Sequence, residues 1–354
     1  MANDSLVAET ARRILGDVCD PQTVNRAPDE SWRGPAWSAL AEAGLPLAWV
    51  PEALGGSGAG LGDGFAVLRE AGHAAVPLPL AETLLAGWLL AQADIPAPGG
   101  VMSCAPAREG DRVVLAGDGT LNGRLRAVPF AKGAAHLAVL AEREGGGTAV
   151  ALVAAGDAHI DHGTSLAGDP LNAVRLDGVR PAAVKDARPG LDAGALLLMG
   201  AAARSMQMAG ALEAILSLSV AYANERVAFG RPIGKFQALQ QSLARLAGEV
   251  AAAIAAAGSA ADAIAASATF DEGVLLEVAS AKVRVGEAAG EGAAIAHQVL
   301  GAIGFTQEHV LHRYTRRLWA WRDDFGSESQ WAVKLGQLVA AKGADALWPM
   351  LAAR

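Results

Sequence analysis

Aromatic residues, cysteines and charged residues are all scarce in this chain of 354 residues. Only 5% of the residues are aromatic and 19% are charged, and the two cysteines are Cys19 and Cys104. Two cysteines far apart, outside any Cys-x-x-Cys pattern, predict neither a disulfide framework nor a zinc site, and they favour a cytoplasmic protein. His159 and His162 share the loop GDAHIDHGT without a further ligand cluster, so no metal site is expected.

The charge balance excludes further classes of function. Acidic residues outnumber basic ones by 37 to 29, and the basic clusters are short ones such as HRYTRR at 312–317. A nucleic-acid-binding protein is expected to carry a basic face, so nucleic acid is not an expected partner. Uncharged stretches such as 250–261 fall short of the roughly 18–20 residues that span a bilayer, and no apolar signal segment is visible. We expect a cytoplasmic globular protein that does not enter a membrane.

Small and apolar residues are abundant, and their spacing divides the chain into three parts. Apolar residues make up 52% of the chain, and 42 residues are glycine. Helical spacing extends to about residue 95, short apolar runs separated by turn residues follow, and helical spacing returns after about residue 190. We therefore expect an N-terminal helical domain at 1–97, a middle β domain at 98–187 and a C-terminal helical bundle at 188–354.

Alanine-rich segments with almost no proline fill the last of these domains. Four of them predict an antiparallel bundle, closely packed because small side chains let helices approach. In the middle domain, runs such as HLAVLAE and TAVALVAA predict an antiparallel sheet or barrel. The glycine-rich loop at 51–64 fits no GxGxxG register, which argues against a Rossmann phosphate loop. The four bundle segments are 193–225, 236–268, 272–302 and 329–352.

Three segments, in the correct order, resemble one known family. AYANERVAFGRPIGKFQALQQSLARLA at 221–247 resembles a helix–turn–helix of acyl-CoA dehydrogenases, with the pattern Y..ER.AFG.PI..FQ..Q..LA. LPLAWVPEALGGSGAGLGD at 45–63 is similar to an N-terminal loop of the family, and HQVLGAIGFTQEHVLHRYTRR at 297–317 to its Q..GG.GFT.E......R segment. The resemblance implies an α+β fold with an N-terminal α-helical domain, a middle β-barrel or β-sandwich domain and a C-terminal four-helix bundle.

The resemblance also implies FAD as the cofactor and a homodimer, a homotetramer or a heterotetramer with a related subunit. In this family the bundle of one subunit completes the flavin site of its neighbour. Arg226 would face the FAD pyrophosphate across that interface, a role that suits a bidentate cation. Phe229 would pack near the flavin or adenine, and Gln237 would lie in the same site. Each residue taken by itself has an alternative that is equally open: Arg226 could cap the end of its helix, and Phe229 could be a core residue. The adenosine half would meet Gln298, Gly301 and Ala302.

The resemblance assigns the chemistry to a carboxylate that removes the α-proton of an acyl-CoA while the flavin takes a hydride from Cβ. Such a base needs an apolar pocket that raises its pKa. In WAWRDDFGSESQW at 319–331, Phe325 stands where the family has glutamate, and Gly200 stands at the family's second glutamate position. The candidate base is therefore Asp324, which is one methylene shorter than glutamate. The alternative is an ion pair between Asp323 or Asp324 and one of the arginines nearby in sequence, Arg316, Arg317 or Arg322.

The middle domain departs from the family in a second place. The strand W(I/V)(T/S)N, whose tryptophan and hydroxyl contact the flavin ring, aligns with AVPF and puts Ala127 and Pro129 at those two positions. Proline has neither a hydroxyl nor an N–H to donate to flavin N5. We expect this departure to affect flavin affinity or redox tuning more than the cross-subunit contacts.

The sequence leads to one expected function and two alternatives. The expected function is an FAD-dependent acyl-CoA dehydrogenase that desaturates an acyl-CoA at Cα–Cβ and passes electrons to an electron-transfer flavoprotein. The first alternative is a non-catalytic FAD-binding partner subunit of a heteromeric acyl-CoA dehydrogenase, which the absence of both glutamates favours. The second is a flavin oxidase or monooxygenase on the same fold.

Overall fold

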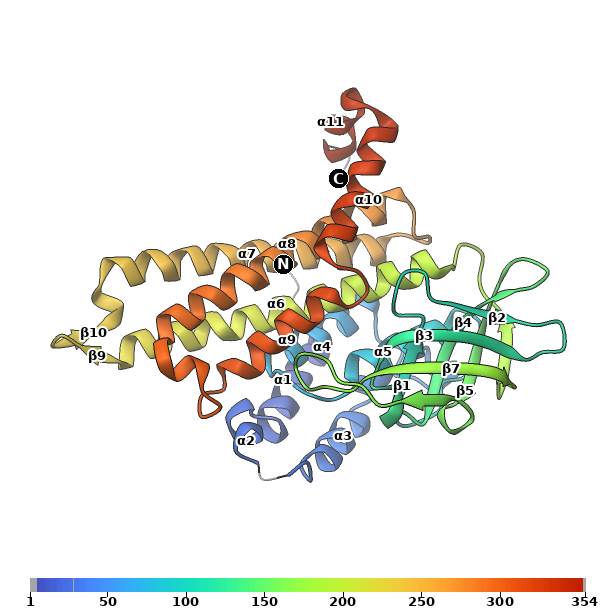
Figure 1. Ribbon diagram of the computed structural model, residues 1–354, viewed down its shortest axis with the longest axis horizontal. Coiled ribbons are helices and arrows are strands. Elements are labelled where there is room, and N and C mark those ends of the chain that lie inside the picture. Colours follow the sequence, from blue (N-terminus) through green and yellow to red (C-terminus); the bar gives the residue numbers. More distant parts are fainter. Residues whose placement is uncertain (1–4, 28, 353–354) are drawn as a thin grey trace.

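The computed structural model describes residues 5–27 and 29–352, which form helices, then a sheet, then longer helices (Figure 1). The N-terminal helices begin at Ser5, whose hydroxyl accepts a hydrogen bond from the amide of Ala8 and so caps α1. Every residue of α5 is buried, which makes it a central core helix of this region. The N-terminal helices are α1 (Leu6–Val18), α2 (Pro21–Arg26), α3 (Arg33–Glu42), α4 (Leu61–His73) and α5 (Leu80–Ala91).

The middle region is a curled sheet of eight strands in the order β6-β7-β3-β2-β4-β5-β8, with β1 also paired to β4. Most neighbours are antiparallel, but β1 and β2 both run parallel to β4, so the expectation of an antiparallel sheet was wrong at these pairs. The β2–β3 hairpin reverses the chain once, and the next reversal brings β4 back in the direction of β2. The strands are β1 (Met102–Ala105), β2 (Arg112–Leu115), β3 (Leu121–Pro129), β4 (His136–Arg143), β5 (Thr148–Ala154), β6 (His159–Asp161), β7 (Leu171–Val179) and β8 (Ala183–Asp186).

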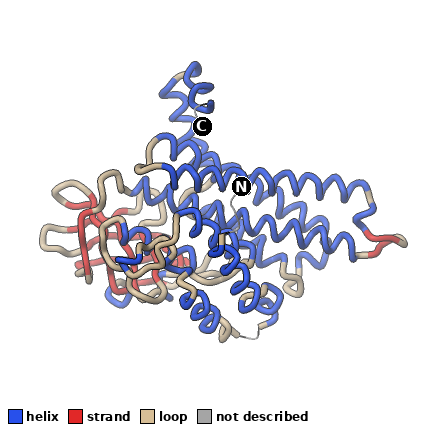
Figure 2. The backbone as a smooth tube through the Cα atoms, turned by 180° about the vertical axis from the view of Figure 1, so that it is seen from behind, coloured by secondary structure: helices blue, strands red, loops and turns tan. Residues whose placement is uncertain are grey.

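Three long helices, α6, α7 and α8, lie side by side and form the body of the C-terminal region (Figures 1 and 2). A short hairpin of β9 (Val227–Ala228) and β10 (Arg231–Pro232) joins α6 to α7 at the end of the bundle away from the sheet (Figure 2). The helices of this region are α6 (Ala193–Glu225), α7 (Gln237–Ala266), α8 (Glu272–Leu300), α9 (Leu311–Asp323), α10 (Glu328–Lys342) and α11 (Ala344–Ala352).

The fourth bundle segment differs from the one the sequence suggested. α9 packs on both α6 and α8, whereas α10 contacts α8 and then leads to α11, which projects away from the body (Figure 1). α9 carries many arginines, yet its apolar residues recur at helical spacing and bury one face. The segment 329–352 is more uniformly apolar, but only Trp331 within it is buried.

The N-terminal region and the bundle meet where α4 crosses α6. A Cβ atom on Gly72 of α4 would lie 1.9 Å from the backbone oxygen of Gln207, and one on Gly210 of α6 would lie 1.9 Å from that of Arg69. Glycine at both positions is therefore what lets the two backbones touch. An ion pair between Arg69 and Glu213, at 2.6 Å, spans the same crossing.

Two described helices, α6 and α7, are long and apolar enough to cross a membrane by length and composition. Both helices carry charged residues within their length, so the longest uncharged stretches in them, such as 250–261, are still shorter than a membrane span. α6 packs against α4, α7, α8 and α9, and α7 packs against α6 and α8, so both serve as helices of the bundle.

Candidate active site and flavin-binding surface

The position that the resemblance assigns to the base lies in the turn after α9. Asp324 caps that helix, and its amide donates to the carbonyl of Trp321 at 3.2 Å. Phe325 follows with φ 55°, a left-handed conformation that few residues other than glycine adopt, and it is 1% exposed. The indole Nε1 of Trp331 donates to the carbonyl of Phe325 at 3.0 Å. These contacts fix the turn with the Phe325 ring directed into the protein.

The ring of Phe325 lies against Gly200 on α6. A Cβ atom on Gly200 would lie 2.2 Å from Cδ1 of that ring, well inside van der Waals contact. The two positions that the resemblance offers for a glutamate therefore face each other, and neither holds a carboxylate. The ring occupies the space between them.

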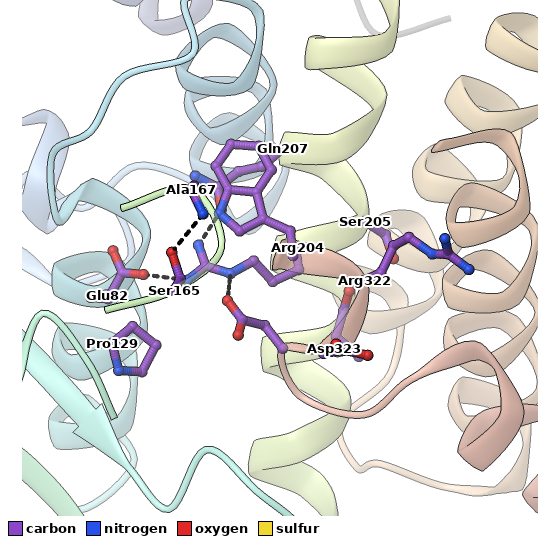
Figure 3. Close-up of polar contacts among 12 residues, drawn as sticks. Glu82, Pro129, Ser165, Ala167, Arg204, Ser205, Gln207, Arg322 and Asp323 are labelled. Atoms are coloured by element: carbon purple, nitrogen blue, oxygen red, sulfur yellow. Dashed lines mark hydrogen bonds and ion pairs between the residues drawn. The ribbon is translucent and has the colours of Figure 1, made fainter. Parts of the chain in front are cut away.

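Asp324 belongs to a buried polar network around Arg204 of α6. Figure 3 shows Arg204 with two other members of this network, Glu82 and Gln207. Its Oδ2 accepts a hydrogen bond from Nε of Arg204 at 3.0 Å. The same guanidinium donates to the carboxylate of Glu82 on α5 and to the side-chain oxygen of Gln207. It also lies over the ring of Phe325, with 6.0 Å between Cζ and the ring centroid. One buried cation thus links α5, α6 and the turn after α9.

Burial and neighbouring charges act in opposite directions on the pKa values of Glu82 and Arg204. Burial raises the pKa of Glu82, and the Arg204 charge offsets some of that effect. Burial alone would lower the pKa of Arg204, but the charges of Glu82 and Asp324 outweigh it and raise that pKa. Asp324 is thereby held as the acceptor of an ion pair, but its partner is Arg204 of α6 and not one of the arginines of α9 that the sequence suggested. The Asp324 carboxylate is therefore engaged with Arg204 in this structure.

Lys282 of α8 holds the end of α9 from the opposite side. Its ammonium donates to the carbonyls of Trp321 at 3.1 Å and Arg322 at 2.6 Å, both in the last turn of α9. Burial lowers the pKa of Lys282 to about 8, against the attraction of Asp324 and Glu328. The turn that carries Asp324 and Phe325 is therefore anchored from both α6 and α8.

The end of β3 offers little to a flavin ring. Pro129 is buried, and its carbonyl accepts the hydroxyl of Ser103 at 2.5 Å, so that oxygen is already engaged. Ala127 is half-buried and lies beside a β-bulge in the pairing of β3 with β7. Neither side chain can donate a hydrogen bond, as the sequence indicates.

The far end of the bundle holds most of the residues expected to bind FAD. An open cleft of about 730 Å³ lies where α6 ends and α8 ends. Arg226, Gly301 and Ala302 all line it, together with Tyr222 and Thr306. The Arg226 backbone caps α6, but among the described residues its exposed side chain has no hydrogen bond or ion pair. An arginine directed to an open cleft suits an anionic ligand.

Three further predicted residues lie around this cleft rather than in its lining. Phe229 is at the tip of the β9–β10 hairpin, 94% exposed with φ 52°, so it is not a core residue. Its ring meets that of Phe236 edge-on at 6.1 Å. Gln237 begins α7 and Gln298 lies in the last turn of α8, both with exposed side chains. An exposed phenylalanine in a strained conformation is typical of an interface.

Sequence reasoning missed Arg204, Glu82 and Lys282. Each is a charged residue within a largely apolar helical segment, such as ALLLMGAAARSMQMAGAL around Arg204 and LAETLLAGWLLA around Glu82. Charged groups are rarely buried without a partner, so each of these segments implies a buried counter-charge. That signal was available, although it does not say which charges pair.

Family models match both helical regions: the acyl-CoA dehydrogenase N-terminal domain at residues 2–93 and the C-terminal domain at 192–322. The acyl-CoA dehydrogenase FadE27 of Mycobacterium tuberculosis is 31% identical over 85% of this chain and 87% of its own length. The chain belongs to the acyl-CoA dehydrogenase family. The acyl-CoA dehydrogenase IpdE2 of the same organism is 29% identical over 88% of this chain and 89% of its own. A solved ChsE4-ChsE5 complex, also from that organism, matches with a TM-score of 0.84 and 26% identity, over 96% of this chain and 97% of that chain.

Membership of the family fixes the class of chemistry. Acyl-CoA dehydrogenases are flavoprotein oxidoreductases that act on the CH–CH bond of an acyl-CoA, and this chain is one of them. The expected fold is confirmed, with a helical N-terminal region, a curled middle sheet and a helical C-terminal region. The bundle end fits FAD, because the Arg226 side chain faces an open cleft beside small residues, whereas the end of β3 fits it poorly.

Proposed function

We propose that this chain is one subunit of a heteromeric, FAD-dependent acyl-CoA dehydrogenase that introduces a double bond between Cα and Cβ of an acyl-CoA. A related chain would supply the catalytic carboxylate. The contact between Phe325 and Gly200 carries the proposal, because it leaves no room for a carboxylate at either family position. The ChsE4-ChsE5 complex, a relative in structure, contains two named components, and this supports such a pairing.

In this arrangement the chain contributes the bundle side of a flavin site that the related subunit completes. FAD, when bound, accepts the hydride that leaves Cβ of the acyl group. Arg226 would bind the pyrophosphate through charge-assisted hydrogen bonds, and the small residues Gly301 and Ala302 would let the backbone approach the adenosine. Phe229 would exclude water at the interface. Gln237 and Gln298 would complete the polar contacts on this side.

The proposal also covers the electron acceptor of the reduced flavin and the cellular location of the protein. The reduced flavin would pass its electrons to an electron-transfer flavoprotein, which the resemblance implies. Two free, buried cysteines and the negative net charge support a cytoplasmic location. A reoxidation assay with purified electron-transfer flavoprotein under nitrogen, compared with air-saturated buffer, separates this acceptor from the oxidase alternative.

The test compares the chain expressed alone with the chain co-expressed with a related acyl-CoA dehydrogenase chain that has the family glutamate. We expect a yellow complex whose flavin absorbance is bleached anaerobically by an acyl-CoA. Replacing the partner's glutamate with glutamine should abolish bleaching, whereas Asp324→Asn in this chain should leave it intact. Bleaching that survives loss of the partner's glutamate would contradict the proposal.

A second candidate function is a homo-oligomeric dehydrogenase in which Asp324 is the base. The burial of Asp324 beside the family position favours it, and the ion pair with Arg204 opposes it. In that case the chain purified alone should be yellow and should oxidise an acyl-CoA. Asp324→Asn should then remove the activity while leaving flavin binding unchanged.

A further inference from the structure

Four arginines that belong neither to the Arg204 network nor to the lining of the flavin cleft form a charged group on α9 and at the start of α3, beside the loop between β6 and β7. Arg313, Arg316 and Arg317 lie on α9, and Arg33 is the first residue of α3. Arg33 and Arg317 are both close enough to lower the pKa of Arg313. We refer to these four residues as the arginine cluster.

Two carboxylates pair with this cluster. Asp169, in the loop after β6, accepts from Nη2 of Arg317 at 2.7 Å. Glu30 lies 2.7 Å from Nη2 of Arg33. The Nε of Arg316 donates to a backbone carbonyl of the β6–β7 loop, which carries no charge. Four guanidinium groups against two carboxylates leave an excess of about two positive charges at the neutral pH where arginine stays protonated. Among the described residues, neither Asp20, which caps α2, nor Asp29 makes an ion pair with these arginines.

Arg313 is the member of the cluster without a partner. Among the described residues its side chain makes no hydrogen bond or ion pair, and its Nε is buried. Burial, followed by repulsion from Arg317, lowers the pKa of Arg313 to about 10, and the attraction of Asp169 offsets only part of this. The Nε atoms of Arg33 and Arg317 are also buried without a hydrogen bond. Buried donors without acceptors are costly, so this cluster is unusual for a purely structural contact.

We propose that the arginine cluster binds a phosphate group in its dianionic form, with Arg313 at the centre. A phosphate monoester near neutral pH carries about the charge that the cluster has in excess, and its oxygens match the planar fork of a guanidinium. The three arginines of α9 recur at helical spacing on one side of that helix, beside the loop before β7, and such a compact group of guanidinium side chains suits a small anion. Inorganic phosphate and the 3′-phosphate of a coenzyme A both present this group. The cluster lies on this chain whichever subunit holds the catalytic base.

The experiment follows thermal unfolding of the full chain in phosphate and in chloride at equal ionic strength. We expect phosphate to raise Tm by about 2–4 °C at a concentration well above its Kd. Arg313→Gln should raise Tm in chloride, since it removes an unpaired cation, and should lose the response to phosphate. Arg245→Gln, at an exposed ion pair with Glu291, is the matched control and should respond as the natural chain does.

Equilibrium dialysis with labelled inorganic phosphate gives a readout that does not rely on the stability of a variant. We expect about one phosphate per chain, displaced by sulfate. A larger Tm response to coenzyme A than to 3′-dephospho-coenzyme A assigns the site to the coenzyme, and equal responses assign it to free phosphate. The proposal is overturned if the natural chain neither retains phosphate nor gains Tm, or if Arg313→Gln keeps the full response.

Discussion

The ring of Phe325 rests on the bare backbone of Gly200, so that a single added carbon on Gly200 would lie 2.2 Å from the ring. In this family one position or the other is expected to present a carboxylate. Here a large residue and the smallest residue complement each other in shape. We therefore regard Gly200 and Phe325 as a packed pair whose fit can be tested directly.

Gly200→Ala should destabilise the chain by about 1–3 kcal/mol, because the new methyl group would overlap a ring that the surrounding turn holds in place. Urea unfolding monitored by circular dichroism gives the measurement. Gly248→Ala, at an exposed position of α7 with nothing within 4 Å, is the control and should be neutral or stabilising. Combining Gly200→Ala with Phe325→Leu should recover part of the loss. Equal stability of the two alanine variants would contradict the packed pair.

Arg204→Met should cost about 3–5 kcal/mol, since it leaves the buried carboxylates of Glu82 and Asp324 without their cation. The measurement is again the free energy of unfolding in urea, at pH 7. Arg245→Met removes an exposed pair and should cost about 0–1 kcal/mol. An Arg204→Met chain as stable as the natural one would show that the network contributes no more than an exposed pair does.

The pH dependence of stability should carry a contribution from Lys282. Its pKa is about 8 in the folded chain and 10.5 in its unperturbed state, so between these values the unfolded chain binds more protons. Stability from this group therefore rises with pH across that window, by about 3 kcal/mol in total. Cys19 and Cys104, whose pKa burial raises to about 12, act in the opposite direction above pH 9.

The quantity to measure is therefore the difference in unfolding free energy between the natural chain and Lys282→Met. We expect this difference to shift in favour of the natural chain as pH rises from about 8 to about 10. Lys334→Met, at a surface ion pair with Glu109, controls for the loss of a lysine and should give a flat difference. A flat difference for Lys282→Met as well would refute the lowered pKa.

Arg226→Gln should weaken FAD binding to the proposed complex by about ten- to a hundredfold, the usual loss when a charge-assisted hydrogen bond is removed. Flavin fluorescence during dilution of the purified complex gives the dissociation constant. Arg226→Lys should show an intermediate loss, because an ammonium keeps the charge without the bidentate fork. Arg245→Gln should retain FAD. Unchanged retention in Arg226→Gln would remove Arg226 from the flavin site.

The sequence predicts the elements of the fold better than their pairing. α6 and α8 are long, apolar and free of proline, so local spacing was sufficient to find them. α9 was missed as a bundle helix because its arginines mask an apolar face that only tertiary packing reveals. The parallel pairing of β2 with β4 depends on the path of the chain between them, which no local pattern records.

The same limit applies to the site. Motif alignment located Phe325 and Gly200 separately, but not that their atoms touch across 125 positions of sequence (325 − 200). The partners of Arg204 are equally distant in sequence, with Glu82 lying 122 positions away. The sequence shows that such residues are charged or apolar, but only the fold shows which of them contact each other.

The crossing of α4 and α6 has a consequence for how the molecule can move. Because Gly72 and Gly210 place the two backbones in direct contact, a relative slide of even one residue would drive a side chain into a carbonyl. We therefore expect the helical N-terminal region and the bundle to move as one rigid unit when a ligand binds. Conformational adjustment is then expected in the middle sheet and not at this crossing.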